Sequence, residues 1–287
     1  MAPKRIGIIG GSGLYRIEGV SVKKEVRLRT PFGRPSDSFL LCEAAGREVV
    51  FLPRHGRRHT LLPSELPFRA NIYGLKKLGV EWIISVSAVG SMKEHIHPRD
   101  LVLPHQFIDR TRRREDSFFG KGMVAHVALA DPICTVLSSV LAQAARQCGA
   151  RVHEGGTYLC MEGPAFSTRA ESQLYRSWGV DVIGMTNLPE AKLAREAEIC
   201  YATMAFATDY DCWHQTAESV TAEMVLENLR QNIGLAQRIL LAAVPAIPLQ
   251  RTCPCARALE NAIVTAGRSI PAETRKELRL IIGKYVR

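Results

Sequence analysis

Two carboxylates stand at the end of a long apolar stretch, and their types and spacing could do acid–base chemistry. The stretch runs from Ile199 to Ala207, and Asp209 and Asp211 follow it two residues apart. If the stretch is a β-strand, side chains alternate across it, so both carboxylates lie on the same side. A buried strand that ends in polar residues is a common way for an α/β protein to build a site. The alternative interpretation is a strand end followed by an Asp-rich turn.

A second group of residues has the chemistry of an anion site. Arg54 and His55 follow an apolar stretch, and these side chains can bind an oxyanion. Gly11-Ser12-Gly13 also follows an apolar stretch and could present amides and a hydroxyl to phosphate, although a tight turn alone explains the glycines. Because the glycine spacing is not G-x-G-x-x-G, a dinucleotide site is disfavoured. His55 and His59 lack the adjacent Glu of a zinc-binding helix, so no metal site is predicted there.

The elements that must position these residues alternate between strand and helix. This alternation predicts a single-domain three-layer α/β/α sandwich around a central mixed, mainly parallel sheet, spanning residues 1–287, with 246–287 as a C-terminal helical tail. In such a fold, the polar residues at several strand ends converge. The predicted strands cover 5–10, 20–28, 39–42, 48–52, 81–91, 100–103, 156–161, 181–185 and 199–207. The predicted helices cover 68–78, 134–148, 168–178, 188–198 and a long segment from about 221.

The composition disfavours several classes of protein. A net charge of +10 suits an anionic partner such as phosphate, a phosphorylated metabolite or nucleic acid. The densest basic cluster, at 110–114, is followed by two acids and is interpreted as a solvated loop, so a nucleotide- or nucleic-acid-binding module is the disfavoured alternative. No apolar run approaches the ~20 residues of a membrane span, and the N-terminus does not resemble a signal peptide. We therefore expect a cytoplasmic protein with no membrane or nucleic-acid partner.

The eight cysteines are too sparse for a disulfide scaffold in a chain of this length. Cys253-Pro254-Cys255 is the unusual pair, because one intervening residue is not the C-x-x-C spacing of redox or zinc sites. A bond between Cys253 and Cys255 would be strained, and Cys134 with Cys200 is an alternative pair. The sequence leaves this pattern open and indicates neither a metal nor an organic cofactor.

Short motifs at the predicted strand ends follow one another in a specific order. They are Gly10-Gly11-Ser12-Gly13-Leu14, Arg54-His55-Gly56, Ser87-Ala88-Val89-Gly90-Ser91, Met161-Glu162-Gly163-Pro164, Gly184-Met185-Thr186, Pro189-Glu190 and Ala207-Thr208-Asp209-Tyr210-Asp211-Cys212-Trp213. Together they resemble the 5'-methylthioadenosine phosphorylases, of the trimeric branch of the purine nucleoside phosphorylases. The resemblance covers roughly residues 5–245.

The resemblance implies an enzyme, a pentosyltransferase of methionine and purine salvage. Phosphate would attack C1' of 5'-methylthioadenosine, giving adenine and 5-methylthioribose 1-phosphate. Phosphate is then a co-substrate, no cofactor is needed, and the resemblance implies a homotrimer. The nearest alternative is a broader purine nucleoside phosphorylase that acts on inosine, guanosine, adenosine or methylthioinosine.

The resemblance also implies a role for each matching residue. Asp209 would supply or share a proton at purine N7, with Asp211 assisting, and an ionised Asp favours a 6-amino over a 6-oxo group because it only accepts hydrogen bonds. Phosphate would contact Ser12, Arg54, His55, Ser87, Ala88 and Thr186. The purine and ribose would contact Val89, Gly90, Phe166, Ser167 and Met185. The 5'-methylthio pocket would be formed by His59, Val225 and Leu226, with His126 from a neighbouring subunit. Helix core remains the alternative interpretation of Val225 and Leu226.

Overall fold

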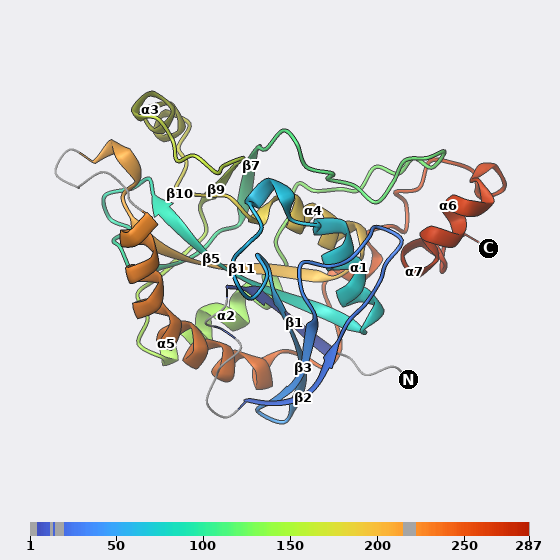
Figure 1. Cartoon of the computed structure of the whole chain (residues 1–287), viewed down its shortest axis with the longest axis horizontal. Coiled ribbons are helices and arrows are strands. Elements are labelled where there is room, and N and C mark those ends of the chain that lie inside the picture. Colours follow the sequence, from blue (N-terminus) through green and yellow to red (C-terminus); the bar gives the residue numbers. More distant parts are fainter. Residues whose placement is uncertain (1–4, 12–13, 15–19, 215–221, 287) are drawn as a thin grey trace.

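The structure is a computed structural model, and it describes residues 5–11, 14, 20–214 and 222–286 (Figure 1). The strands are β1 (Arg5–Gly10), β2 (Val20–Val26), β3 (Phe39–Ala44), β4 (Arg47–Pro53), β5 (Val80–Ser91), β6 (Leu101–Leu103), β7 (Gln106–Arg110), β8 (Val152–Glu154), β9 (Thr157–Met161), β10 (Val182–Gly184) and β11 (Cys200–Asp209). The α-helices are α1 (Phe68–Lys77), α2 (Thr135–Gln147), α3 (Arg169–Ser177), α4 (Asn187–Glu196), α5 (Ala222–Ala246), α6 (Ala272–Glu277) and α7 (Arg279–Ile282).

One mixed sheet joins the 11 strands of the described residues. Its centre is parallel, because β5 pairs in parallel with β1 and β11, and β1 pairs in parallel with β4. β7, β9 and β10 are parallel to one another, but β10 meets β5 in the antiparallel sense. β2 and β3 add an antiparallel edge. The predicted mixed, mainly parallel sheet is therefore confirmed.

Helices cover both faces of the central strands. Figure 1 shows α2 and α5 on one side of β5 and β11, and α1 and α4 on the other. The two-sided cover explains why all ten residues of β11 are buried, since a strand packed on both faces needs apolar side chains throughout. On α5, the buried residues Ala236, Ile239, Leu240 and Ala243 recur at helical spacing, which is the pattern of a helix with one face against the core.

Two short strands were missed by the sequence prediction. β8 has only three residues, and β7 ends the path of strands and is half-exposed, so neither carries a strong apolar pattern. The remaining predicted strands and helices are present, with ends that differ by a few residues. Among the described residues, no helix combines the length and apolar character that crossing a membrane requires.

Candidate active site

The site lies on β5, at a place where two other strands end facing each other. β11 covers one edge of β5 along most of its length. On the other edge, β1 pairs with β5 as far as Ser85, and the antiparallel β10 pairs with Gly90 and Ser91. The carboxyl ends of β1 and β10 therefore point toward each other across residues 86–89 of β5.

The two candidate carboxylates meet in a way that strand alternation did not predict. β11 ends at Asp209 with a register irregularity, and Asp211 begins a 3-10 turn with φ of 52°. The expectation of one continuous strand through both residues is wrong, and the alternative of a turn is correct for Asp211. The turn nevertheless joins them, because the backbone N–H of Asp211 donates to Oδ1 of Asp209 at 2.8 Å.

Both carboxyl groups are buried beside hydroxyl donors. Oδ2 of Asp209 accepts from Oγ1 of Thr208 at 2.7 Å, and Oδ2 of Asp211 accepts from Oγ of Ser172 at 2.6 Å. Burial raises the pKa of both carboxyl groups, more than these hydrogen bonds lower it. A carboxyl group with a raised pKa can hold a proton closer to neutral pH and give it to a leaving group.

The strand facing Asp209 needs glycine at position 90. A Cβ there would lie 3.0 Å from Oδ1 of Asp209 and 3.1 Å from the side chain of Ile183, so a larger residue would displace the carboxylate. The preceding Val89 is buried, and its carbonyl accepts from the Thr208 hydroxyl at 3.2 Å. The end of β5 therefore sets the position of the Asp209 carboxylate.

The loop after β9 lies next to the same turn. The thiol of Cys212 donates to the carbonyl of Ser167 at 3.3 Å, which joins this loop to the residue after Asp211. Phe166, one residue earlier, is 44% exposed, which is unusual for a large apolar ring. Its open face is available for stacking on a planar ligand.

The Arg54 side chain is held in place by other protein groups, unlike an arginine that is free to bind an anion. Its guanidinium is buried and forms a bidentate ion pair with Glu190, with Nε 3.0 Å from Oε2 and Nη2 3.1 Å from Oε1. It also donates to Oγ of Ser85 at 2.6 Å and to the Val86 carbonyl at 3.0 Å. These contacts use most of its five N–H donors. Arg54 thus fixes β5 just before Ser87 and retains little capacity for a ligand.

His55, the next residue, presents a neutral imidazole. Its Nδ1 lies 2.8 Å from the carbonyl of Leu61, so Nδ1 carries the proton and Nε2 is the acceptor. Burial lowers the pKa of His55 to about 4, and the ring stacks on His59 with centroids 4.4 Å apart. A neutral imidazole can accept a hydrogen bond from a protonated phosphate oxygen.

The hydroxyls of Ser87 and Tyr158 are buried and near each other, and neither makes a hydrogen bond of ordinary geometry among the described residues. Ser87 is only 7% exposed, so an unsatisfied hydroxyl there is costly unless a ligand completes it. Thr186 is also buried and does not use its side chain to cap α4. Tyr158 covers Gly184, whose added Cβ would lie 2.0 Å from the Tyr158 oxygen.

The prediction of a solvated loop at 110–114 is wrong for Arg114. Arg112 and Arg113 are exposed, but the Arg114 side chain is 1% exposed and pairs with Glu162 at 3.2 Å. Arg114 also donates to the carbonyl of Met185 at 2.7 Å and so positions the segment that leads to Thr186. Sequence reasoning missed this residue because nothing local separates it from its exposed neighbours.

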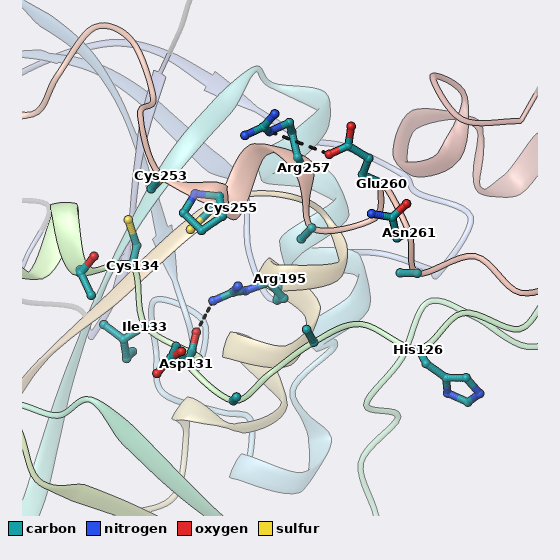
Figure 2. A pocket seen from close by; sticks show the side chains of 16 residues that line it. His126, Asp131, Ile133, Cys134, Arg195, Cys253, Cys255, Arg257, Glu260 and Asn261 are labelled. Atoms are coloured by element: carbon teal, nitrogen blue, oxygen red, sulfur yellow. Dashed lines mark hydrogen bonds and ion pairs between the residues drawn. The ribbon is translucent and has the colours of Figure 1, made fainter.

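Some predicted site residues are not placed beside Asp209. Ser12 lies outside the described residues, as do the side chains of Val225 and Leu226 on α5. His126 lines a different hollow, to which several cysteines also contribute. Figure 2 shows its imidazole at the right of the view, pointing away from the cysteines. Within one chain, His126 is therefore not joined to the site.

Sequence comparison gives the class of protein. The sequence pattern of the phosphorylase superfamily matches residues 5–245, which is most of the chain and includes every element of the site. The chain therefore belongs to the phosphorylase superfamily and has its fold.

Individual relatives narrow the assignment. The chain is 59% identical to the S-methyl-5'-thioadenosine phosphorylase of Geobacter sulfurreducens, covering 98% of this chain and 99% of the relative. It is 58% identical to the enzyme of the same name from Koribacter versatilis, covering 98% and 96%. A methylthioadenosine phosphorylase structure from an antarctic soil metagenomic library matches with a TM-score of 0.93 at 48% identity, covering 98% of this chain and 99% of that one. The chain belongs to the S-methyl-5'-thioadenosine phosphorylase family.

Proposed function

We propose that this enzyme cleaves the N-glycosidic bond of 5'-methylthioadenosine with phosphate, giving adenine and 5-methylthioribose 1-phosphate. The observation that carries the proposal is the spacing of two kinds of group along β5. Gly90 is paired with Asp209, and Ser87, with its unsatisfied hydroxyl, comes three residues earlier. At ~3.3 Å per residue, these positions are about 10 Å apart, which leaves room for a pentose between an anion and a base.

The groups proposed to bind phosphate would need little rearrangement of the protein to do so. The Ser87 hydroxyl would gain the partner that it lacks, and neutral His55 would accept from a protonated phosphate oxygen through Nε2. Arg54 acts as a positioning residue that holds β5 just before Ser87. Cleavage of the glycosidic bond builds positive charge on the ribose, which the adjacent phosphate anion stabilises. No protein nucleophile, metal or organic cofactor is needed for this step.

At the base end, Asp209 is proposed to deliver or share the proton that purine N7 takes up as the base leaves. Its raised pKa suits that role, and Asp211 holds it through the 2.8 Å backbone hydrogen bond. The exposed Phe166 would stack on the purine, with Ser167 beside it. While one carboxyl oxygen holds the proton for N7, the other oxygen can only accept a hydrogen bond, so it pairs with a 6-amino group and not with a 6-oxo group. Adenine is therefore the expected base.

Structures of relatives agree with this choice of ligand. A methylthioadenosine phosphorylase from Schistosoma mansoni has been solved in complex with adenine, with a TM-score of 0.84 at 36% identity, covering 90% of this chain and 96% of that one. The S12T mutant of the Schistosoma enzyme has been solved with methylthioadenosine, with a TM-score of 0.83 at 35% identity and coverage of 90% and 96%.

The direct test is the release of adenine from methylthioadenosine with and without phosphate. We expect release only when phosphate is present, with formation of 5-methylthioribose 1-phosphate. Inosine, supplied at the same concentration, should react far more slowly. Equal kcat/KM for inosine and methylthioadenosine would instead favour a broad purine nucleoside phosphorylase.

The proposal includes a homotrimer in the cytoplasm. His126 is exposed and is not joined to the site of its own chain, which is what a residue serving a neighbouring subunit requires. The eight cysteines are all free, as suits a reducing compartment. Light scattering should give three times the chain mass, and cell fractionation should recover activity from the cytosol. A monomer with full activity would contradict the trimer.

A further inference from the structure

Four cysteines from three distant parts of the chain meet at one place. Cys134 precedes α2, Cys200 begins β11, and Cys253 and Cys255 belong to the tail after α5. Their sulfur atoms all lie within 4.8 Å of one another. Figure 2 shows Cys134, Cys253 and Cys255 together at one end of a hollow of about 520 Å³. None of the four takes part in the site around Asp209.

The geometry of the cluster suits a single metal ion better than a disulfide. All four thiols are free, and Sγ of Cys200 lies 3.2 Å from Sγ of Cys253. A disulfide needs about 2.05 Å and joins only two sulfurs. Four sulfurs at ~2.3 Å from one tetrahedral zinc ion lie about 3.8 Å apart. The 3.2 Å between Cys200 and Cys253 and the 4.8 Å limit that holds for all four sulfur atoms lie on either side of that distance.

We propose that Cys134, Cys200, Cys253 and Cys255 bind one Zn²⁺ as a closed tetrathiolate site. The sequence indicated no metal here, because Cys253 and Cys255 are one residue apart instead of two. The fold supplies the other two ligands, because it brings Cys134 and Cys200 next to Cys253 and Cys255. Since all four positions around the ion are filled by sulfur, the site has no open position for catalysis.

The charges around the cluster can support such an ion. Zinc with four thiolates carries two negative charges, and the four protons displaced from the thiols pass to solvent. The side chains of Arg195 and Arg257 line the same hollow, together with those of Asp131 and Glu260. Cys134 also stands at the start of α2, where the helix dipole favours an anion.

The position of the cluster assigns it a structural role. Cys200 and Asp209 are at opposite ends of β11, nine residues apart, which at ~3.3 Å per residue is about 30 Å. The ion would tie the tail, through Cys253 and Cys255, to the sheet and to α2. Loss of zinc should therefore lower stability while leaving the substrate site intact.

The test compares the whole enzyme with two cysteine variants. Wild-type protein, expressed with zinc and purified without chelator under reducing conditions, is analysed for metal by mass spectrometry. Cys255→Ser removes one ligand, and Cys148→Ser is the matched control, because Cys148 is a free cysteine outside the cluster. A zinc-free sample reconstituted with Co²⁺ reports the ligand set through the intense visible absorption of a tetrahedral thiolate complex.

We expect about one zinc per chain in the wild type and in Cys148→Ser, and loss of most of it in Cys255→Ser. Chelation should lower Tm by several degrees, and added zinc should restore it. Wild-type protein without stoichiometric zinc, or with iron in its place, would overturn the proposal, as would a mass that shows disulfides in fresh protein. If Cys255→Ser fails to fold, the zinc content and the Co²⁺ spectrum of the wild type still decide. Phosphorolysis is measured separately, so either result stands without the other.

Discussion

Replacing Asp209 by Asn separates the proton-transfer role of this residue from its structural role. The side chains have nearly the same shape, and only the ability to hold a transferable proton is lost. Oδ1 accepts from the N–H of Asp211 at 2.8 Å, and the amide oxygen of Asn can keep that bond. The amide nitrogen must then occupy the position of Oδ2, which now accepts from Thr208 at 2.7 Å.

The structure indicates that Thr208 can adapt to this change. Its hydroxyl lies 3.2 Å from the carbonyl of Val89 as well as 2.7 Å from Asp209. In the variant, the hydroxyl can donate to Val89 and accept from the Asn amide, so no buried polar group loses its partner. The variant should therefore fold, with a Tm close to that of the wild type.

The expected loss of activity follows from the missing proton. General acid catalysis by a positioned group contributes about 10²–10⁴-fold in rate, or roughly 3–5 kcal/mol of activation free energy. We expect Asp209→Asn to lower kcat/KM for methylthioadenosine by this factor and to lower it less for 6-oxopurine nucleosides, to which an amide can donate. Asp211→Asn, a change in a supporting residue, should cost less.

The assay is phosphate-dependent adenine release across pH, with inosine and methylthioinosine as comparison substrates. Burial raises the pKa of Asp209, so the wild-type rate should fall as pH rises through that value and the carboxyl group ionises. The pH–rate profile of Asp209→Asn should lack this fall in rate. A folded variant with full activity and an unchanged preference for methylthioadenosine would refute the role of Asp209.

Three further changes test the supporting groups. Ser87→Ala should raise KM for phosphate by about tenfold or more, since a hydrogen bond to a charged group contributes roughly 1.5–3 kcal/mol, and an unchanged phosphate KM would remove Ser87 from the site. Glu190→Ala leaves the buried guanidinium of Arg54 unpaired and should cost roughly 3–5 kcal/mol of unfolding free energy in urea, whereas an unaltered midpoint would show that the pair contributes nothing. Burial raises the pKa of Glu196 from 4.5 to about 7, so the folded state binds this proton more tightly than the unfolded state does. The free energy of unfolding should therefore fall as pH rises between those values, by roughly 3 kcal/mol at most, and Glu196→Gln should flatten that dependence. Parallel stability curves for the wild type and Glu196→Gln would contradict this.

Much of the fold could be predicted because its signals are local. The apolar run before Asp209 predicted a buried strand, and β11 is buried at every position. A long helix was predicted from about residue 221, and α5 is present there, with Ala236 and Leu240 buried against the core. Periodicity of this kind follows from backbone geometry, so it is visible without knowing which elements become neighbours.

The partners of charged and polar residues could not be predicted in that way. Glu190 belongs to a recognised motif, yet its pairing with Arg54 spans 136 residues and depends on how α4 packs near β5. The Arg114 side chain is buried because it reaches Glu162 and the Met185 carbonyl, whereas Arg112 and Arg113 donate to Glu162 through their backbone N–H groups and leave their side chains exposed. Contacts between distant residues depend on packing, which no local pattern encodes.

The sequence by itself determined the chemistry that this protein can offer: a carboxylate pair after a buried strand, an Arg-His pair after another, and small residues at the end of a third. Tertiary structure decided how these groups are used. It turned Asp211 back so that its N–H donates to Asp209, paired Arg54 with Glu190, and brought the antiparallel β10 against Gly90 and Ser91 of β5. It also gathered four scattered cysteines, because contact is set by the paths of the strands and not by spacing along the chain.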